Sequence, residues 1–248
     1  EFLKECLPAV DSDVAKRLRK QLEKRGISFS MQSAVKRIST EGVVFERKGK
    51  EDTVSAEIVL VATGRMPNTE GLNLEAAGVE YSPKGITTDD RMHTNVEGIY
   101  AIGDVNGRQM LAHAATMQGY MVVNEILGKQ SGICLDIMPA AIFTRPEAAC
   151  VGVSEDFCKE KGMEYTCRKA FFRSNGKALS MNETEGMLKI IADNNGKIIG
   201  CHCFGPHSAD IVQEISVLMC RETTISQLAD MVHIHPTLGE IIHDAAME

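Results

Sequence analysis

The sequence lacks an apolar run near the roughly 20 residues that span a bilayer, and it lacks a signal peptide. It also lacks an excess of positive charge. Lys and Arg number 27 against 34 Asp and Glu, a net charge of −7, which argues against nucleic acid or an anionic membrane as the main partner. We therefore expect a soluble protein, and the length of 248 residues predicts one or two domains.

No two cysteines show C-x-x-C spacing, so neither a zinc ribbon nor a thioredoxin-like pair is indicated. The eight cysteines are scattered, which favours free, mostly buried thiols and a reducing, cytoplasmic location. Cys201 and Cys203 lie two apart in an expected strand, so they share one face and are predicted to pack in the core.

The first part of the chain has the pattern of an α/β unit. Asp11 or Ser12 can cap a helix in which Val14, Leu18 and Leu22 recur on one face. Residues 58–62 open the run IVLVATG, which is apolar and largely β-branched. This composition predicts a strand buried on both faces, and GIYAIGD predicts another.

The texture changes near residues 132–138, after an expected helix at 111–127. Strand patterns come first, including a hairpin around Asp193-Asn-Asn-Gly196, and helices near 208–220, 226–231 and 236–246 follow. We therefore predict an α/β remnant followed by an α+β layer, an antiparallel sheet with helices on one side.

Three short motifs are weak when taken singly. ATGRMPN and AIGDV each end an expected strand in a glycine turn, where a backbone can approach a ligand. QMLAHAA begins a helix whose N–H groups could stabilise negative charge. Plain turns and an ordinary helix start explain these motifs equally well.

The stretch HIHPTLGE has a more specific pattern. Pro236 suits a first helical position and keeps His235 outside the helix, while Glu240 lies inside it. A carboxylate that accepts from one imidazole nitrogen raises the basicity of the other, which is an acid–base couple. A buried structural knot remains open, and so does a metal site, which needs more ligands to converge: His233, His202 or His207.

Together and in this order, the motifs resemble the C-terminal half of the flavin-dependent pyridine nucleotide–disulfide oxidoreductases. His233 and Leu238 favour the lipoamide-oxidising branch, while glutathione-type and mercuric reductases remain alternatives. The matching segments span the chain: VLVATGRMPNTEGLNLEAAGVE, TNVEGIYAIGDVNGRQMLAHAATMQG, IFTRPEAACVGVSE, NETEGMLKIIAD and HIHPTLGEIIHDAA.

The resemblance implies that His235 is a base that deprotonates a substrate thiol, and that Glu240 orients it. It also implies that His235 acts on the redox disulfide of the other subunit. It implies that Gly64 approaches the nicotinamide nucleotide, that Glu1 binds the adenosine ribose of NAD, and that Val35 lines the adenine pocket. For FAD, the resemblance assigns Asp104 to the ribityl or phosphate region. The residues that it places against the isoalloxazine are Met110, Leu111, Ala112 and His113.

The departures from the family pattern are absences. No G-x-G-x-x-G occurs, no two cysteines lie five apart, and the chain starts without methionine. The resemblance then implies three parts: the end of an NAD domain (1–64), the second segment of an FAD domain (65–136) and a dimerisation domain (137–248). We expect a piece that lacks FAD and is inactive alone. A non-enzymatic dimerisation module is the alternative.

The resemblance also implies partners. These are a second copy, bound through the C-terminal domain, and the acyltransferase core of a 2-oxoacid dehydrogenase or glycine-cleavage complex.

Overall fold

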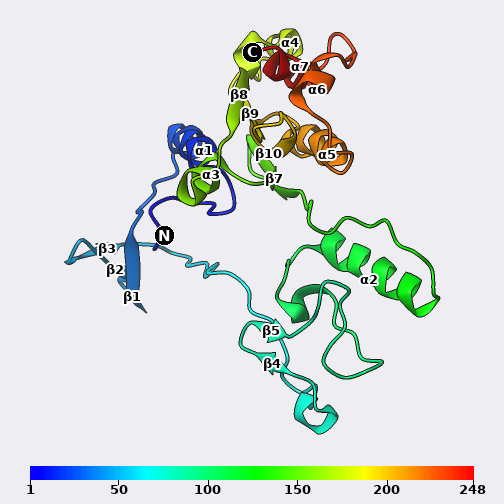
Figure 1. Cartoon of the computed structure of the whole chain (residues 1–248). Helices are drawn as coiled ribbons and strands as arrows, with labels where there is room; N and C mark the ends of the chain where they lie inside the picture. The colour runs from blue at the N-terminus through cyan, green and yellow to red at the C-terminus, as the bar shows by residue number, and fades with distance from the viewer. The chain divides into compact units, whose positions relative to one another are not determined.

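A five-stranded antiparallel sheet dominates the first of two units into which the chain divides in the computed structural model, which describes all 248 residues. This unit comprises Glu1–Val59 and Ile137–Glu248, and the second comprises Leu60–Asp136. The strand order is β6-β7-β10-β9-β8 (Figure 1). The bounds are β6 Ala140–Ile142, β7 Glu147–Gly152, β8 Thr166–Phe171, β9 Met187–Ala192 and β10 Ile198–Gly205.

The hairpin between β9 and β10 confirms the prediction made from Asp193-Asn-Asn-Gly196. The Asp193 carboxylate accepts from the backbone N–H groups of Asn195 and Lys197, both at 2.9 Å. Gly196 has a φ of +79°, which costs little without a Cβ. A side chain and a glycine therefore close the turn that sets the register of the two central strands.

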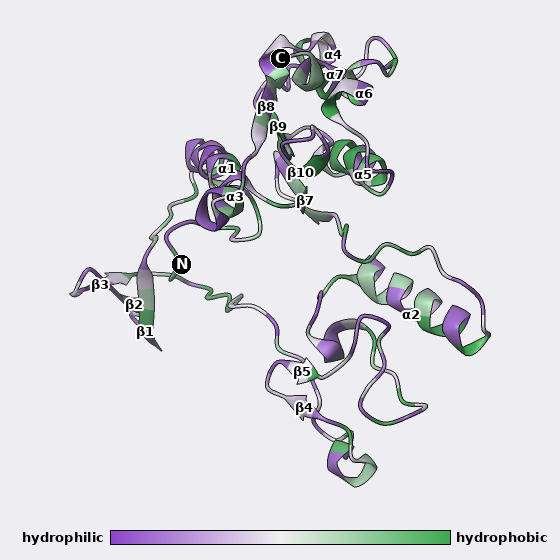
Figure 2. Cartoon of the chain, in the orientation of Figure 1, coloured by the Kyte–Doolittle hydropathy of each residue, from purple (hydrophilic) through white to green (hydrophobic).

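Helices cover both faces of this sheet. On one face α5 (Ser208–Met219), α6 (Ile225–Ala229) and α7 (Glu240–Met247) enclose the largest core cluster, as predicted. Successive strand residues point to opposite faces, so Cys203 joins this cluster while Phe204 joins the other. In Figure 2 the hydrophobic colour is strong in α5, whereas α1 carries mostly the hydrophilic colour.

The other face is covered by α1 (Ser12–Lys24), a helix from the opposite end of the chain. Asp11 caps it by accepting from the Asp13 N–H at 3.0 Å, which confirms the predicted start. Val14 and Leu18 are fully buried, and each such side chain contributes about 1.5–3 kcal/mol. The one-sided layer predicted for the C-terminal domain thus gains a second helical layer from α1.

Short elements complete the first unit. The strands β1, β2 and β3 form a separate antiparallel sheet. Ser154 caps α3 by accepting from the Phe157 N–H at 3.0 Å. The bounds are β1 Ser33–Ser39, β2 Gly42–Arg47, β3 Lys50–Val54, α3 Glu155–Lys161, η3 Phe172–Ser174 and α4 Gly176–Met181.

The strand predicted at residues 58–62 does not form. Ile58 and Leu60 are 87% and 85% exposed, and no strand of the chain pairs with this stretch. A strand buried on both faces needs neighbours in a sheet, and this chain supplies none beside it. GIYAIGD also forms no strand, although Ala101 is buried and Tyr100 makes an isolated bridge with His93.

The second unit is built around α2 (Ala112–Ile126), close to the predicted 111–127, and a small core of Val79, Ile86 and Ala101. Gly107 follows η2 with a φ of +67°, and a Cβ there would lie 1.9 Å from the Lys84 carbonyl oxygen. The remaining elements are η1 Leu74–Ala77, β4 Tyr81–Ser82, β5 Gly85–Ile86 and η2 Gly103–Asn106. Every helix is too short or too polar to cross a membrane.

Candidate active site

His235 and Glu240 lie together, as the sequence predicts. The His235 Nδ1 is 2.8 Å from the Glu240 Oε1, and the His235 side chain is 78% exposed. Since the carboxylate only accepts, Nδ1 carries the proton in this contact, and the lone pair of the neutral ring lies on Nε2. The arrangement can take a proton from a solvent-side group at Nε2.

The turn between these residues holds the carboxylate from a second side. The Thr237 N–H donates to Glu240 Oε2 at 2.8 Å. This bond, followed by the hydrogen bond from His235, lowers the pKa of Glu240. Glu240 therefore stays ionised near neutrality, which keeps its acceptor oxygens available to the imidazole.

The helix starts later than predicted. α7 begins at Glu240, so Pro236 does not occupy the first helical position, and the His235–Pro236 peptide bond is cis. His235 lies outside the helix, as predicted, and Glu240 is the first helical residue. The Glu240 carboxylate accepts from the backbone N–H of Thr237, three residues before it.

His233 differs from His235 in its surroundings. Its side chain is 9% exposed, with Nε2 at 3.2 Å from Glu214 and Nδ1 at 3.2 Å from the Met231 carbonyl oxygen. Its ring centroid lies 5.9 Å from that of His243. Both ring nitrogens already have partners, so His233 is not arranged as an open base.

The other two histidines weighed as metal ligands bind elsewhere. His202 is fully buried, where Nδ1 accepts from the Asp11 N–H at 3.0 Å and Nε2 donates to the Val153 carbonyl at 3.1 Å. Burial lowers the pKa of His202. His207 contacts Asp210 at 3.2 Å on the surface. The structure does not bring His202, His207 and His233 together.

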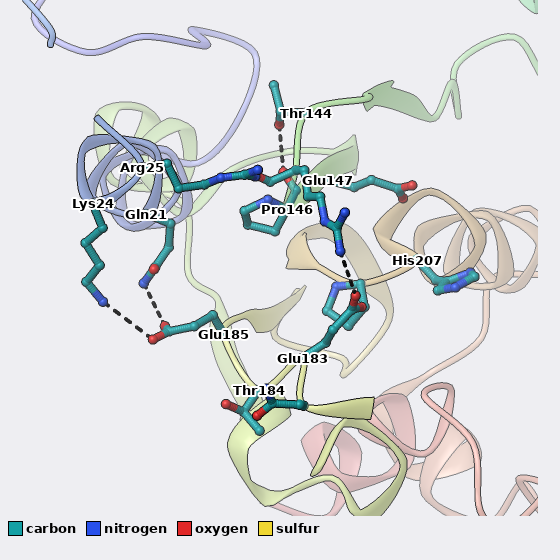
Figure 3. Close-up of a pocket in the computed structure, with 13 residues that line it drawn as sticks. Gln21, Lys24, Arg25, Thr144, Pro146, Glu147, Glu183, Thr184, Glu185 and His207 are labelled. Carbon is teal, nitrogen blue, oxygen red and sulfur yellow. Dashed lines mark hydrogen bonds and ion pairs between the residues drawn. The ribbon is translucent and has the colours of Figure 1, made fainter. Parts of the chain in front are cut away.

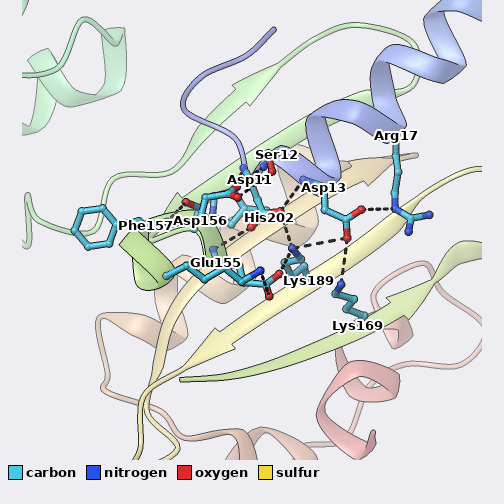
Figure 4. Close-up of polar contacts among 12 residues, drawn as sticks. Asp11, Ser12, Asp13, Arg17, Glu155, Asp156, Phe157, Lys169, Lys189 and His202 are labelled. Carbon is cyan, nitrogen blue, oxygen red and sulfur yellow. Dashed lines mark hydrogen bonds and ion pairs between the residues drawn. The ribbon is translucent and has the colours of Figure 1, made fainter. Parts of the chain in front are cut away.

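His202 belongs to a buried polar cluster that sequence reasoning missed (Figure 4). The Lys189 ammonium, fully buried in β9, lies 2.6 Å from Asp11 and 2.8 Å from Glu155. Burial alone would lower the pKa of Lys189, but these carboxylates outweigh it and raise the pKa. Hydrogen bonds from Lys159 and Lys189 lower the pKa of Glu155 to about 2. The lysine inside the apolar run MLKIIA was the signal available in the sequence.

The residues assigned to the flavin lie in the second unit. Asp104 is in η2, with a half-exposed carboxylate 3.8 Å from Arg65. The buried Gln118 of α2 accepts from the Gly103 N–H at 2.7 Å, which ties η2 to this helix. Met110 and Leu111 precede α2, and Ala112 and His113 are its first residues. Gln118 was also missed from the sequence.

The residues assigned to the nicotinamide nucleotide are divided between the two units. Glu1 is exposed and lies beside the start of β1, because the Ser33 N–H donates to its carbonyl at 2.8 Å. Val35 of β1 is exposed. Gly64 is in the second unit with a φ of +113°. Glu1 and Val35 thus belong to the first unit, and Gly64 belongs to the second.

A cavity of about 560 Å³ opens beside α1 (Figure 3). Its acidic groups already have partners: Glu185 binds Gln21 at 2.6 Å and Lys24 at 3.5 Å, and Glu183 lies 3.6 Å from Arg145. His207, weighed above as a metal ligand, lines the cavity, but neither His235 nor Glu240 does. This cavity and the His235–Glu240 couple are therefore separate features.

All eight cysteines are free thiols. Cys201 and Cys203 are fully buried in one cluster, which confirms the predicted core packing. Burial raises the pKa of both and brings that of Cys203 to about 12. These two thiols are therefore poor sources of thiolate at neutral pH.

Comparison with protein families matches both parts of the chain. Residues 138–246 match the dimerisation domain of pyridine nucleotide-disulphide oxidoreductases, and residues 1–119 match the pyridine nucleotide-disulphide oxidoreductase domain. Dihydrolipoyl dehydrogenase of Pisum sativum is 36% identical over 100% of this chain and 51% of its own length. Dihydrolipoyl dehydrogenase of Bacillus subtilis is 37% identical over 98% of this chain and 53% of its own length. Leghemoglobin reductase of Glycine max is 36% identical over 100% of this chain and 49% of its own length.

Solved structures agree with these relatives. The HOCl-induced flavoprotein disulfide reductase RclA from Escherichia coli has a TM-score of 0.87 at 26% identity, covering 100% of this chain and 58% of the other. LpdA from Mycobacterium tuberculosis has a TM-score of 0.87 at 29% identity, covering 99% and 55%. The chain spans about half the length of the curated relatives it matches. It belongs to the pyridine nucleotide–disulfide oxidoreductase family.

Proposed function

We propose that this chain is the C-terminal half of a dihydrolipoamide dehydrogenase. The whole protein would oxidise dihydrolipoamide to lipoamide with NAD, by way of a redox disulfide and FAD. Relatives named dihydrolipoyl dehydrogenase, at 36–37% identity over 98–100% of the chain, support this branch of the family. Without the rest of that protein, the chain alone is expected to be inactive.

The observation that carries the proposal is the bond between His235 Nδ1 and Glu240 Oε1. Oxidation of a dithiol by a disulfide requires a thiolate, because a neutral thiol is a poor nucleophile. The open Nε2 of His235 would accept the thiol proton, and the ionised Glu240 would stabilise the imidazolium that forms. The thiolate sulfur would then attack the redox disulfide, which the cysteines of this chain do not provide in C-x4-C spacing.

The family implies a flavin, and residues of the second unit fit part of one. No side chain caps the N-terminus of α2, which leaves the positive end of a 15-residue helix open to a polar group. Asp104 would hold the ribityl or phosphate region, and Met110, Leu111, Ala112 and His113 would lie against the isoalloxazine. When bound, FAD would carry electrons between the dithiol and the nicotinamide. The chain lacks the glycine-rich turn that binds the pyrophosphate, so we expect it to hold no FAD alone.

For the nicotinamide nucleotide we propose NAD. The Glu1 carboxylate would bind the ribose hydroxyls, Val35 would line the adenine pocket, and Gly64 would allow close backbone approach. A carboxylate at the first position disfavours the 2′-phosphate of NADP.

The dimerisation domain over residues 138–246 suggests a homodimer. Exposed apolar side chains around the site, Val232 at 99% and Ile234 at 79%, support an interface there. His235 would then act on the disulfide of the other subunit. We further propose the acyltransferase core of a 2-oxoacid dehydrogenase or glycine-cleavage complex as partner, and a cytoplasmic location that keeps the eight thiols reduced.

The proposal is tested on the full-length protein that contains this chain. NAD-linked oxidation of dihydrolipoamide should exceed NADPH-linked reduction of glutathione disulfide or Hg²⁺. A preference for glutathione disulfide or Hg²⁺ would assign the protein to another branch. A dimer by light scattering without redox turnover would instead identify a non-enzymatic dimerisation module.

A further inference from the structure

The loop that carries His235 is fixed at only a few points: His233 contacts Glu214, Leu238 packs against the core, and the Thr237 hydroxyl donates to the Ile234 carbonyl oxygen at 2.7 Å. Residues 232–239 form neither helix nor strand, and Val232 and Ile234 are almost fully exposed. A general base must be held close to its productive geometry, since small displacements are costly for rate. The position of the His235 ring therefore depends on what fixes this loop to the domain.

Asn175 reaches the loop from 62 residues away. Its side chain is buried at 2% exposure, and its Nδ2 donates to the Thr237 carbonyl oxygen at 3.1 Å. Its Oδ1 accepts from the Ala178 N–H at 3.0 Å and so caps α4. One rigid amide thus joins the start of a helix to the centre of the loop.

The Thr237 backbone continues the connection to the imidazole. Its carbonyl accepts from Asn175, and its N–H donates to Glu240 Oε2 at 2.8 Å. The other carboxylate oxygen, Oε1, accepts from His235 Nδ1 at 2.8 Å. A rotation of Thr237 would move Oε2, and the carboxylate would then carry Oε1 away from the ring.

We propose that Asn175 is a positioning residue for the His235–Glu240 couple, acting through the Thr237 backbone. Its importance for turnover rests on the proposed function, but its effect on the His235 tautomer does not. The competing account is that Asn175 serves only as the N-cap of α4, and the two hydrogen bonds of its amide can be separated by substitution.

Asn175→Asp separates them. A carboxylate still accepts from the Ala178 N–H, so the cap remains, but it cannot donate to the Thr237 carbonyl. Asn175→Ser likewise keeps an acceptor oxygen for the cap and adds no charge. It removes the Nδ2 amide that reaches the Thr237 carbonyl, and its hydroxyl lies one bond closer to the backbone. Ser154→Ala, which removes the cap of α3, is the matched control for loss of a cap away from the loop.

The readout is the tautomer of His235 in this chain, measured by long-range ¹H–¹⁵N NMR of the imidazole rings at pH 8, above the ordinary imidazole pKa of about 6.5. The parent chain and Ser154→Ala should show the Nδ1–H form at His235. Asn175→Asp and Asn175→Ser should show a mixture with the Nε2–H form, while Cys201 and the rest of the core keep their parent signals. An unchanged Nδ1–H form in either folded Asn175 variant would overturn the proposal.

In the full-length protein, Asn175→Ser should slow dihydrolipoamide oxidation by about tenfold and leave NADH-dependent reduction of an artificial acceptor unchanged. Suppose that the NMR change appears but neither Asn175→Ser nor loss of His235 slows dithiol oxidation. The proposed function is then wrong, while the positioning role of Asn175 stands. If only loss of His235 slows oxidation and the tautomer is unchanged, the positioning is wrong.

Discussion

Two apolar runs of similar sequence have opposite fates in this molecule. MLKIIA becomes β9, with every residue buried, whereas IVLVA at residues 58–62 is mostly exposed and forms no strand. β9 is paired on both edges, by β8 and β10, and helices cover both of its faces. Burial of a strand is thus a property of its neighbours, and the chain supplies them for one run and not for the other.

The largest expected effect comes from the charge inside the buried run. Lys189→Ala would remove the ammonium that pairs with the carboxylates of Asp11 and Glu155, and would leave both carboxylates without a cation. Removing one partner of a buried ion pair costs about 3–5 kcal/mol. Urea unfolding of the chain measures the loss. Lys197→Ala, which breaks an exposed 2.7 Å pair with Glu222, should cost less than about 1 kcal/mol. Equal losses of unfolding free energy in Lys189→Ala and Lys197→Ala would show that the buried cluster around Lys189 does not stabilise the fold more than a surface ion pair.

A direct comparison of the two runs should give the next largest difference. Ile190→Ala in β9 should destabilise the chain by about 2–5 kcal/mol, because the cavity forms in a closed core. Leu60→Ala in the exposed run should change the unfolding free energy by less than about 0.5 kcal/mol. The same urea titration measures both. A large loss from Leu60→Ala would mean that residues 58–62 are buried in solution.

A third stability effect depends on pH and arises at His202 in β10. Burial lowers the pKa of His202, so the unfolded chain binds its proton more readily than the folded chain. The stability due to neutral His202 is complete above about pH 6.5 and is lost as pH falls towards the folded-state pKa, by at most about 1.4 kcal/mol per pH unit. His202 bonds to the Asp11 N–H and the Val153 carbonyl, and the charges near it are the Asp11 carboxylate, Lys189 and Asp156.

His202→Gln should reduce this slope between pH 6.5 and 5 in urea titrations. Carboxylates such as Glu155, whose pKa is about 2, contribute their loss of stability below about pH 4.5, outside that window. The same slope in the parent chain and in His202→Gln would show that another group titrates there.

The sequence predicted those elements whose determinants are local. Asp11 marks the start of α1, and Asp193 and Gly196 mark the β9–β10 turn, because each acts on residues close to it in the chain. The His235–Glu240 contact, five residues apart, was predictable for the same reason.

The features that the sequence did not predict are long-range. Lys189 meets Asp11 across 178 residues and Asn175 meets Thr237 across 62, and no local pattern encodes either distance. Residues 58–62 failed as a strand for the complementary reason, since an apolar run cannot indicate whether its sheet partners exist. The flavin-side and nucleotide-side assignments, from Asp104 to Glu1, stay predictions, as do the domain boundaries.

The central claim is that His235 takes the proton from the substrate dithiol while His233 does not. In the full-length protein, His235→Gln should slow dihydrolipoamide oxidation by about 10²–10⁴, the usual contribution of a positioned general base, and Glu240→Gln should slow it less. His233→Gln should stay within a few-fold, roughly the effect of a nearby residue that does not transfer the proton. Diaphorase activity, which needs no substrate thiol, should survive all three changes. Intact dithiol oxidation in His235→Gln, or its abolition in His233→Gln, would contradict the account.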